Sequence, residues 1–208
     1  MNVYDFDGTI YPSNATVGFF IWCIFRHPKL IFTFAPKVAW YMLLCAIGRM
    51  PQCLLYRRFL GFLKKVENVD AEIERYWNKN EKKIASWYLN QKRDDDLIMT
   101  ASPSCIIGPI AKRIGVDYVA TEYVIDYEVF IDNFMYAKEK ARYMIDHNLP
   151  VIEKFYSDSI SDTPIALLAD KAYLVSRGAT KVEDWPKMDS KMLKKAKKRT
   201  ESGWNIHI

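Results

Sequence analysis

Short strand-like segments alternate with helical segments along the second half of the chain. The expected strands are residues 2–7, 96–102, 116–120, 152–157 and 172–175, and the expected helices are 103–114, 137–146 and 163–169. Ser102-Pro103 is a favourable N-cap followed by proline at the first helical position, and Gly115 is a favourable helix end. Such alternation is typical of a parallel sheet with helices on both faces. We therefore expect an α/β fold.

Residues 13–90 interrupt this pattern, because they lack strand-like alternation and show repeated helical spacing. Ile73, Tyr76 and Trp77, for example, fall on one face of a helix. We expect residues 1–12 and 91–208 to form the α/β core and residues 13–90 to form an inserted helical domain.

Carboxylates follow two of the expected strands. Asp5 and Asp7 close the first strand, and Asp158 and Asp162 follow the strand 152–157. Because ligands bind at the carboxyl ends of parallel strands, these groups are expected to lie close together. Two carboxylates can divide the roles of nucleophile and general acid, and Asp158 could reach the same Mg²⁺ ion as Asp5. A turn rich in Ser and Asp is the structural alternative for the second group.

Two further segments could hold an anion. Thr100-Ala101-Ser102 places a hydroxyl and backbone N–H groups at a helix N-terminus, where a phosphate is readily bound, although an ordinary N-cap explains the segment as well. Lys138 and Lys140 open a helix, where the dipole disfavours cations, so a negative site could hold one of them. A solvated helix face is the alternative.

The order and placement of these motifs resemble the haloacid dehalogenase superfamily, and the run 156–164 resembles its phosphoserine-phosphatase-like subfamily. The resemblance implies a Rossmann-like core, a small helical cap at 13–90, and Mg²⁺-dependent hydrolysis of a phosphomonoester through an aspartyl-phosphate. It implies that Asp5 is the nucleophile and Asp7 the acid/base. The phosphate would be bound by Thr100, Ala101 and Lys140. Mg²⁺ would be bound by Asp5, Asp7 and Asp158, with Asp162 in a supporting role.

Some positions depart from the subfamily's pattern. Met135 and Ala137 stand where a cysteine and a glycine are usual, and Lys138 leaves open which lysine binds the phosphate. These changes concern the fit of the substrate more than the chemistry, because the two motifs that hold Asp5 with Asp7 and Asp158 with Asp162 are intact.

Residues 15–48 are unusually apolar, with Lys37 the only charge between Leu30 and Gly48. A membrane-spanning helix needs roughly 20 apolar residues, and Pro28 and Pro36 interrupt this segment. Two alternatives stay open: helices that bury their rings against each other, or a membrane-surface cap that acts on a lipid phosphate such as a phosphatidylglycerophosphate-like molecule. A binding module without turnover is a third hypothesis, which the intact aspartates disfavour.

The charge and cysteine content of the chain exclude few classes of function. A net charge of +5 does not require a nucleic-acid partner, and the basic run 187–199 is typical of a solvated tail. The four cysteines lack metal-binding spacing and are expected to be free thiols in a reducing compartment. The first residues do not resemble a signal peptide. We expect a cytoplasmic protein with a phosphorylated small-molecule substrate, with membrane contact and oligomeric state left open.

Overall fold

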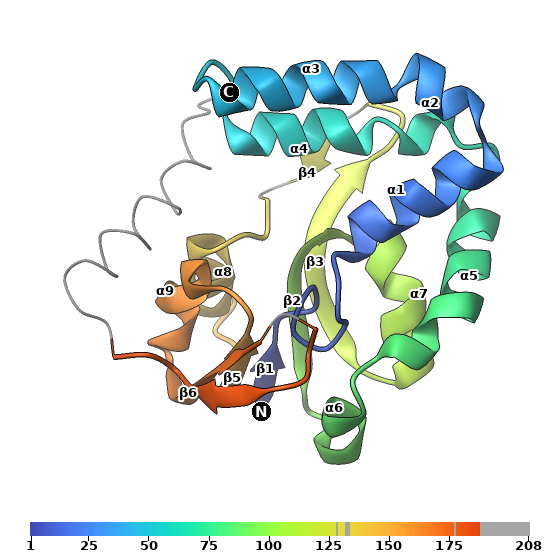
Figure 1. Cartoon of the computed structure of the whole chain (residues 1–208). Coiled ribbons are helices and arrows are strands. Elements are labelled where there is room, and N and C mark those ends of the chain that lie inside the picture. The colour runs from blue at the N-terminus through green and yellow to red at the C-terminus, as the bar shows by residue number, and fades with distance from the viewer. Residues whose placement is uncertain (128, 132–133, 177, 188–208) are drawn as a thin grey trace.

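The computed structural model of the chain describes residues 1–127, 129–131, 134–176 and 178–187, and it shows a seven-stranded sheet with helices on both sides (Figure 1). The strands are β1 (Asn2–Tyr4), β2 (Leu97–Pro103), β3 (Asp117–Val124), β4 (Val129–Ile131), β5 (Ile152–Ser157), β6 (Ala169–Val175) and β7 (Val182–Asp184). The α-helices are α1 (Ala15–Arg26), α2 (Lys29–Thr33), α3 (Ala35–Ala46), α4 (Gln52–Leu60), α5 (Val69–Asn80), α6 (Ser86–Gln91), α7 (Ser104–Ile114), α8 (Lys138–Asp146) and α9 (Thr163–Ala166). Three short 3-10 helices are η1 (Leu63–Lys65), η2 (Glu81–Lys83) and η3 (Ile160–Asp162).

The strands lie in the order β4-β3-β2-β1-β5-β6-β7. The five strands β1, β2, β3, β5 and β6 are parallel, whereas β4 and β7 pair antiparallel at the two edges. The chain leaves β1 toward β2 on one side and later returns as β5 on the other side. β1 is therefore the point at which the strand order switches direction, where α/β sheets bind ligands. The expected parallel α/β fold is confirmed.

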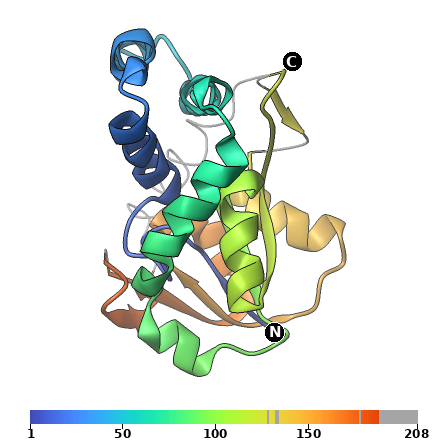
Figure 2. The ribbon, with the colours of Figure 1, turned by 90° about the vertical axis from the view of Figure 1, so that its right-hand side faces the viewer.

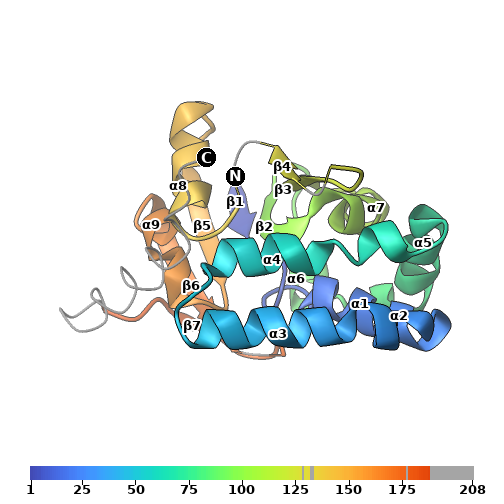
Figure 3. The same cartoon turned by 90° about the horizontal axis from the view of Figure 1, so that it is seen from above.

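Successive residues of the central strands enter two separate hydrophobic clusters. Val3 and Phe155 pack with residues of α8 and α9, whereas Tyr4 and Tyr156 pack with residues of α5 and α7. Alternate side chains of a strand point to opposite faces, so both faces of the sheet are covered, as Figure 3 also shows. The near-continuous apolar character of these strands follows from this double burial.

A row of aromatic rings crosses the sheet on the α7 face. Tyr4 of β1 pairs in register with Tyr156 of β5, which pairs with Tyr173 of β6. The rings stack with centroid distances of 4.8 Å for Tyr4 and Tyr156 and 4.9 Å for Tyr156 and Tyr173. The row links three parallel strands through side-chain contacts as well as backbone hydrogen bonds.

The helical block between β1 and β2 makes contact with the sheet layer at both of its ends. Helix α5 lies beside α7 (Figure 2), and its Trp77 is fully buried and donates from Nε1 to the carbonyl of Ile106 at 2.7 Å. Helix α1 buries Phe19 and Cys23. The expected helices of this block are therefore present, while its division from the core as a separate domain stays a prediction.

Helix α3 differs from its neighbours because none of its residues is buried. It lies against α4 at the outer end of the molecule (Figures 1 and 3). Burial of the rings of residues 15–48 is confirmed for Phe19 and Phe34 and is wrong for Phe32 and Trp40, which are exposed. Within the described ranges, every helix falls short of the length and apolar character needed to cross a membrane.

The beginning of α7 corrects one expectation. Ser102 is not its N-cap, because β2 continues to Pro103 and the helix begins at Ser104 without a side-chain cap. The ladder between β2 and β3 shifts register between Thr100 and Pro103, so Ala101 and Ser102 leave the regular pairing. Bulges of this kind are common next to active sites, where they redirect a side chain. The C-terminal end of α7 is as expected, with Gly115 in the left-handed conformation.

The burial of Trp77 yields a test of this packing. Replacing Trp77 by Ala should lower the free energy of unfolding by about 3–5 kcal/mol, because a large side chain and its hydrogen bond are lost from the core. The measurement is urea unfolding followed by circular dichroism. Trp40→Ala is the matched control, since Trp40 is 57% exposed and should change stability by no more than about 0.5 kcal/mol. Equal losses in the two variants would contradict the described packing of α5.

Candidate active site

The turn after β1 directs two carboxylates away from the hydrophobic core. Phe6 lies between Asp5 and Asp7, is fully buried and packs edge-on against Trp77 at a centroid distance of 5.9 Å. The backbone N–H of Asp5 still donates to the carbonyl of Tyr156 at 2.8 Å, so pairing with β5 extends to this residue. Gly8 then reverses the chain with φ +77°, a conformation that favours glycine. Both aspartates consequently line a cavity at the carboxyl end of β1.

A buried lysine connects three parts of the chain at this cavity. Lys140 Nζ from α8 donates to Asp5 Oδ1 at 2.6 Å and to Asp162 Oδ2 at 2.8 Å. The hydroxyl of Ser157 also donates to Asp162 Oδ2, at 2.9 Å. Lys140 is 2% exposed, whereas Lys138 is exposed to solvent. Lys140 is therefore the lysine beside Asp5, which favours it over Lys138 as the phosphate-binding lysine, and that role stays a prediction.

Asp7 contacts a different set of groups from Asp5. Its Oδ1 accepts from the backbone N–H of Ala15 at 2.6 Å, and its Oδ2 accepts from the hydroxyl of Ser102 at 2.5 Å. Ser102 in turn lies 2.8 Å from the hydroxyl of Thr16. The first turn of α1 and the bulge of β2 thus hold the Asp7 carboxylate in one orientation. This role of Ser102 was missed from the sequence, which predicted Ser102 as the N-cap of the following helix.

Asp158 lies directly against the turn at Gly8. A Cβ atom added to Gly8 would be 2.3 Å from Asp158 Oδ2 and 2.7 Å from its carboxyl carbon. No side chain fits at position 8 while Asp158 keeps this place. The carboxylates that follow β1 and β5 in the sequence are therefore close in space, and Asp5, Asp7, Asp158 and Asp162 line the same cavity of about 440 Å³.

The predicted phosphate-binding segment lies partly at this cavity. Ala101 lines it, whereas Thr100 is fully buried and its hydroxyl accepts from the backbone N–H of Ser102 at 3.1 Å. Thr100 therefore shapes the bulge that exposes Ala101. Phosphate binding by Thr100, Ala101 and Lys140 stays a prediction.

Burial and the neighbouring charges shift the proton affinity of these groups. Burial raises the pKa of Asp5, Lys140 lowers it, and the charges of Asp162 and Asp158 raise it again, with a net increase. Burial also raises the pKa of Asp7, to about 6, against the hydrogen bond from Ala15. For Lys140 burial works against the ammonium, but Asp162 and Asp5 outweigh it and raise its pKa. The cavity thus holds more negative charge than its one buried lysine offsets.

The donor set of this cavity fits Mg²⁺. Mg²⁺ is usually held by one or two carboxylates together with waters and substrate phosphate oxygens, and Asp5 and Asp158 supply two such carboxylates. A divalent cation would also offset the excess negative charge beside Asp5. Across the part of the chain that the structure describes, no three His, Cys, Asp or Glu side chains form a ready-made metal cluster. Both carboxylate oxygens of Asp7 accept a hydrogen bond, and its predicted contact with the metal stays a prediction.

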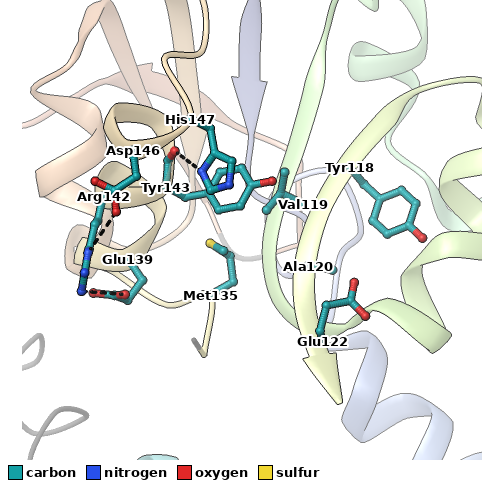
Figure 4. Close-up of a pocket in the computed structure, with 10 residues that line it drawn as sticks. All are labelled: Tyr118, Val119, Ala120, Glu122, Met135, Glu139, Arg142, Tyr143, Asp146 and His147. Carbon is teal, nitrogen blue, oxygen red and sulfur yellow. Dashed lines mark hydrogen bonds and ion pairs between the residues drawn. The ribbon is translucent and has the colours of Figure 1, made fainter. Parts of the chain in front are cut away.

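A second hollow of about 440 Å³ lies between β3 and α8 (Figure 4). It contains none of the predicted site residues. Its charged groups already interact with each other, since Arg142 pairs with Asp146 at 3.2 Å and with Glu139 at 3.9 Å. His147 contacts the backbone carbonyl of Tyr143 through Nδ1. This hollow therefore lacks the converging carboxylates and lysine that distinguish the first cavity.

The contact between Gly8 and Asp158 yields a test of the site's geometry. Gly48→Ala is the matched control, because Gly48 also has a positive φ, +73°, but has no atom within 4 Å of an added Cβ. The control should lose about 1–2 kcal/mol of unfolding free energy from its backbone conformation alone. Gly8→Ala should lose about 1–3 kcal/mol more, because the added methyl overlaps Asp158. Urea unfolding measures both, and equal losses would show that Asp158 does not lie against the turn.

Comparison with known proteins places this geometry in a family. A search of curated proteins finds no match. Among solved structures, a protein of unknown function from Bordetella pertussis Tohama I is 17% identical with a TM-score of 0.68, covering 83% of this chain and 87% of that one. A phospho-aspartyl intermediate analogue of phosphoserine phosphatase is 13% identical with a TM-score of 0.50, covering 82% and 83%. Cytosolic 5'-nucleotidase IIIB bound to cytidine is 16% identical with a TM-score of 0.52, covering 80% and 68%.

These structural similarities show a shared fold. The sequence model of the haloacid dehalogenase-like hydrolases matches residues 3–167, which include most of β1, all of α8 and the residues that follow β5. The chain belongs to the haloacid dehalogenase-like hydrolase family.

Proposed function

We propose that this hydrolase is a Mg²⁺-dependent phosphatase that hydrolyses a phosphomonoester through an aspartyl-phosphate on Asp5. The observation that carries the proposal is the contact of Lys140 with both Asp5 and Asp162, beside Asp158, in one cavity. A dianionic phosphoryl group approaches a carboxylate nucleophile only where cations offset the repulsion. Lys140 supplies one such charge, and Mg²⁺ held by Asp5 and Asp158 would supply the other.

Asp5 is suited to the role of nucleophile by the different surroundings of its two oxygens. Oδ1 is held by Lys140 at 2.6 Å, whereas the hydroxyl of Thr9 is 3.5 Å from Oδ2. We assign Oδ2 as the attacking atom. In the first step the bond between Oδ2 and phosphorus forms, the bond to the leaving oxygen breaks, and that oxygen takes a proton from Asp7.

Asp7 then acts in the opposite direction. It removes a proton from a water molecule whose oxygen attacks the phosphorus, and the bond between Asp5 and phosphorus breaks to release inorganic phosphate. The net change is an ester and water converted to an alcohol and phosphate. The hydrogen bonds from Ala15 and Ser102 orient Asp7 for both transfers. Ala101 and Lys140 are proposed to contact the phosphoryl oxygens, with Thr100 and Asp162 in support.

The proposal also has a second substrate class, a phosphate carried on a lipid. One observation favours it: the side chains of Phe25 on α1 and Phe32 on α2 are 83% and 81% exposed. Parallel screens of water-soluble phosphomonoesters and of phosphorylated lipids in vesicles, both scored by phosphate release, separate the two classes. No release from any substrate would favour the third hypothesis, a binding module without turnover.

Replacement of Asp5 tests the nucleophile. Asp5→Asn should lower phosphate release by about a thousandfold or more, because the amide cannot form the phosphorylated intermediate. Asp146→Asn is the control, since Asp146 lines the hollow of Figure 4 and should leave activity unchanged. Substantial activity in Asp5→Asn with a native unfolding transition would refute the assignment.

Replacement of Asp158 tests the metal site. Chelation should abolish activity and added Mg²⁺ should restore it, while Asp158→Asn should raise the Mg²⁺ concentration for half-maximal activity by about tenfold or more. Asp170→Asn, which changes an exposed aspartate on β6, should leave this concentration unchanged. Activity that persists in chelator would contradict the proposed role of the metal.

A further inference from the structure

The helices α2 and α3 expose several large apolar side chains. Pro36, Trp40 and Leu43 on α3 and Ile47 at its C-cap recur at intervals of four, three and four residues, so they form one stripe along the helix. Trp40, Leu43 and Ile47 are each more than half exposed. The α2–α3 surface is defined here by its exposed large apolar side chains, which are Ile31, Phe32, Trp40, Met42, Leu43 and Ile47.

The position of α3 explains why this stripe has no partner within the described residues. The helix lies against α4 through its other side and forms the outer boundary of the molecule (Figures 1 and 3). Phe32 on the adjoining α2 is 81% exposed. Isolated apolar side chains on a surface are common, whereas several exposed ones on two helices in contact are typical of an interaction site.

The sequence segment that carries this surface, residues 8–66, has charges of one sign. One of them, Arg26, is already paired with the buried Glu72 at 2.6 Å. From Gly8 to Val66 the sequence contains eight of the chain's 30 Lys and Arg and none of its 25 Asp and Glu. The eight are Arg26, Lys29, Lys37, Arg49, Arg57, Arg58, Lys64 and Lys65. Residues 8–66 are therefore strongly basic, while the rest of the chain carries a net negative charge. Its partner must be apolar in part and negatively charged.

Charge complementarity distinguishes the occupants that could cover the surface. A second copy of the chain would bring the same cations against each other, and the segment 187–199 of this chain is itself basic, with seven Lys or Arg and one Asp. An anionic lipid leaflet provides both an apolar interior for Trp40 and Phe32 and negative headgroups for the lysines and arginines. Tryptophan is also the side chain that favours the membrane interface.

We propose that the α2–α3 surface is a docking site for an anionic lipid bilayer, on which the chain lies without crossing it. The proposal rests on the exposed side chains and the charge, and it holds whichever phosphate ester the catalytic cavity accepts. Binding requires both kinds of contact: the apolar side chains enter the membrane interface, and the basic residues are attracted to the negatively charged headgroups.

The test is flotation of the full chain with vesicles. Vesicles of phosphatidylcholine with phosphatidylglycerol should bind the chain, vesicles of phosphatidylcholine alone should bind it much more weakly, and salt should reduce the binding. Trp40→Ser combined with Phe32→Ser should lower the partition coefficient by about tenfold or more. Lys29→Glu combined with Lys37→Glu should lower it by about tenfold or more on anionic vesicles only.

Leu167→Ser combined with Leu89→Ser is the matched control, because both leucines are exposed but lie outside the α2–α3 surface. Its partition coefficient should equal that of the unchanged chain. Every variant should retain the unchanged chain's unfolding midpoint and its hydrolysis of a soluble ester such as p-nitrophenyl phosphate, which separates this proposal from the catalytic one. Equal losses in the control and the Trp40/Phe32 variant would overturn the proposal, as would no binding to anionic vesicles. A vesicle-independent dimer that Trp40→Ser dissolves, or capture of an acidic protein instead of lipid, would also overturn it.

Discussion

The buried ammonium of Lys140 is the interaction on which the arrangement of this site depends. It joins Asp5 at the end of β1 to Asp162 after β5, and it does so from the first turn of α8. Two buried carboxylates without this cation would repel each other and lose much of their solvation. The same contact involves only Oδ1 of Asp5 and leaves Oδ2 to other partners. One lysine therefore permits the close approach of the aspartates and also makes the surroundings of the two Asp5 oxygens different.

Asp7 is held by different means, although it lies only two residues from Asp5. It accepts hydrogen bonds from the first turn of α1 and from the bulge of β2. The two aspartates consequently differ in partners as well as in position, in keeping with the different roles proposed for them. Ala15 is the first residue of α1, so its backbone hydrogen bond to Asp7 connects the helical block to the site.

The sequence was sufficient for the five parallel strands but not for the short edge strands β4 and β7. It was also sufficient for the meeting of distant carboxylates, because the carboxyl ends of parallel strands lie at one edge of the sheet. The distinction between Lys140 and Lys138 can be seen in the sequence only once the helix is known. Lys140, Ala141 and Met144 then share the buried side of α8, whereas Lys138 is exposed. The sequence was insufficient for Ser102, because a register shift in the ladder leaves no signature in a single sequence. It was also insufficient for α3, because a helix that is apolar all around its circumference gives no indication of which side meets solvent.

The row of Tyr4, Tyr156 and Tyr173 has a consequence for catalysis that lies outside the core it fills. If β5 slipped by one residue against β1, Tyr156 would move to the α8 face and Phe155 to the α7 face, and Asp158 would be displaced along the strand by roughly 3 Å. That displacement is comparable to the whole span over which a carboxylate can contact an ion. The stacked tyrosines oppose such a slip, so the alignment of the two halves of the site depends on rings that do not line its cavity.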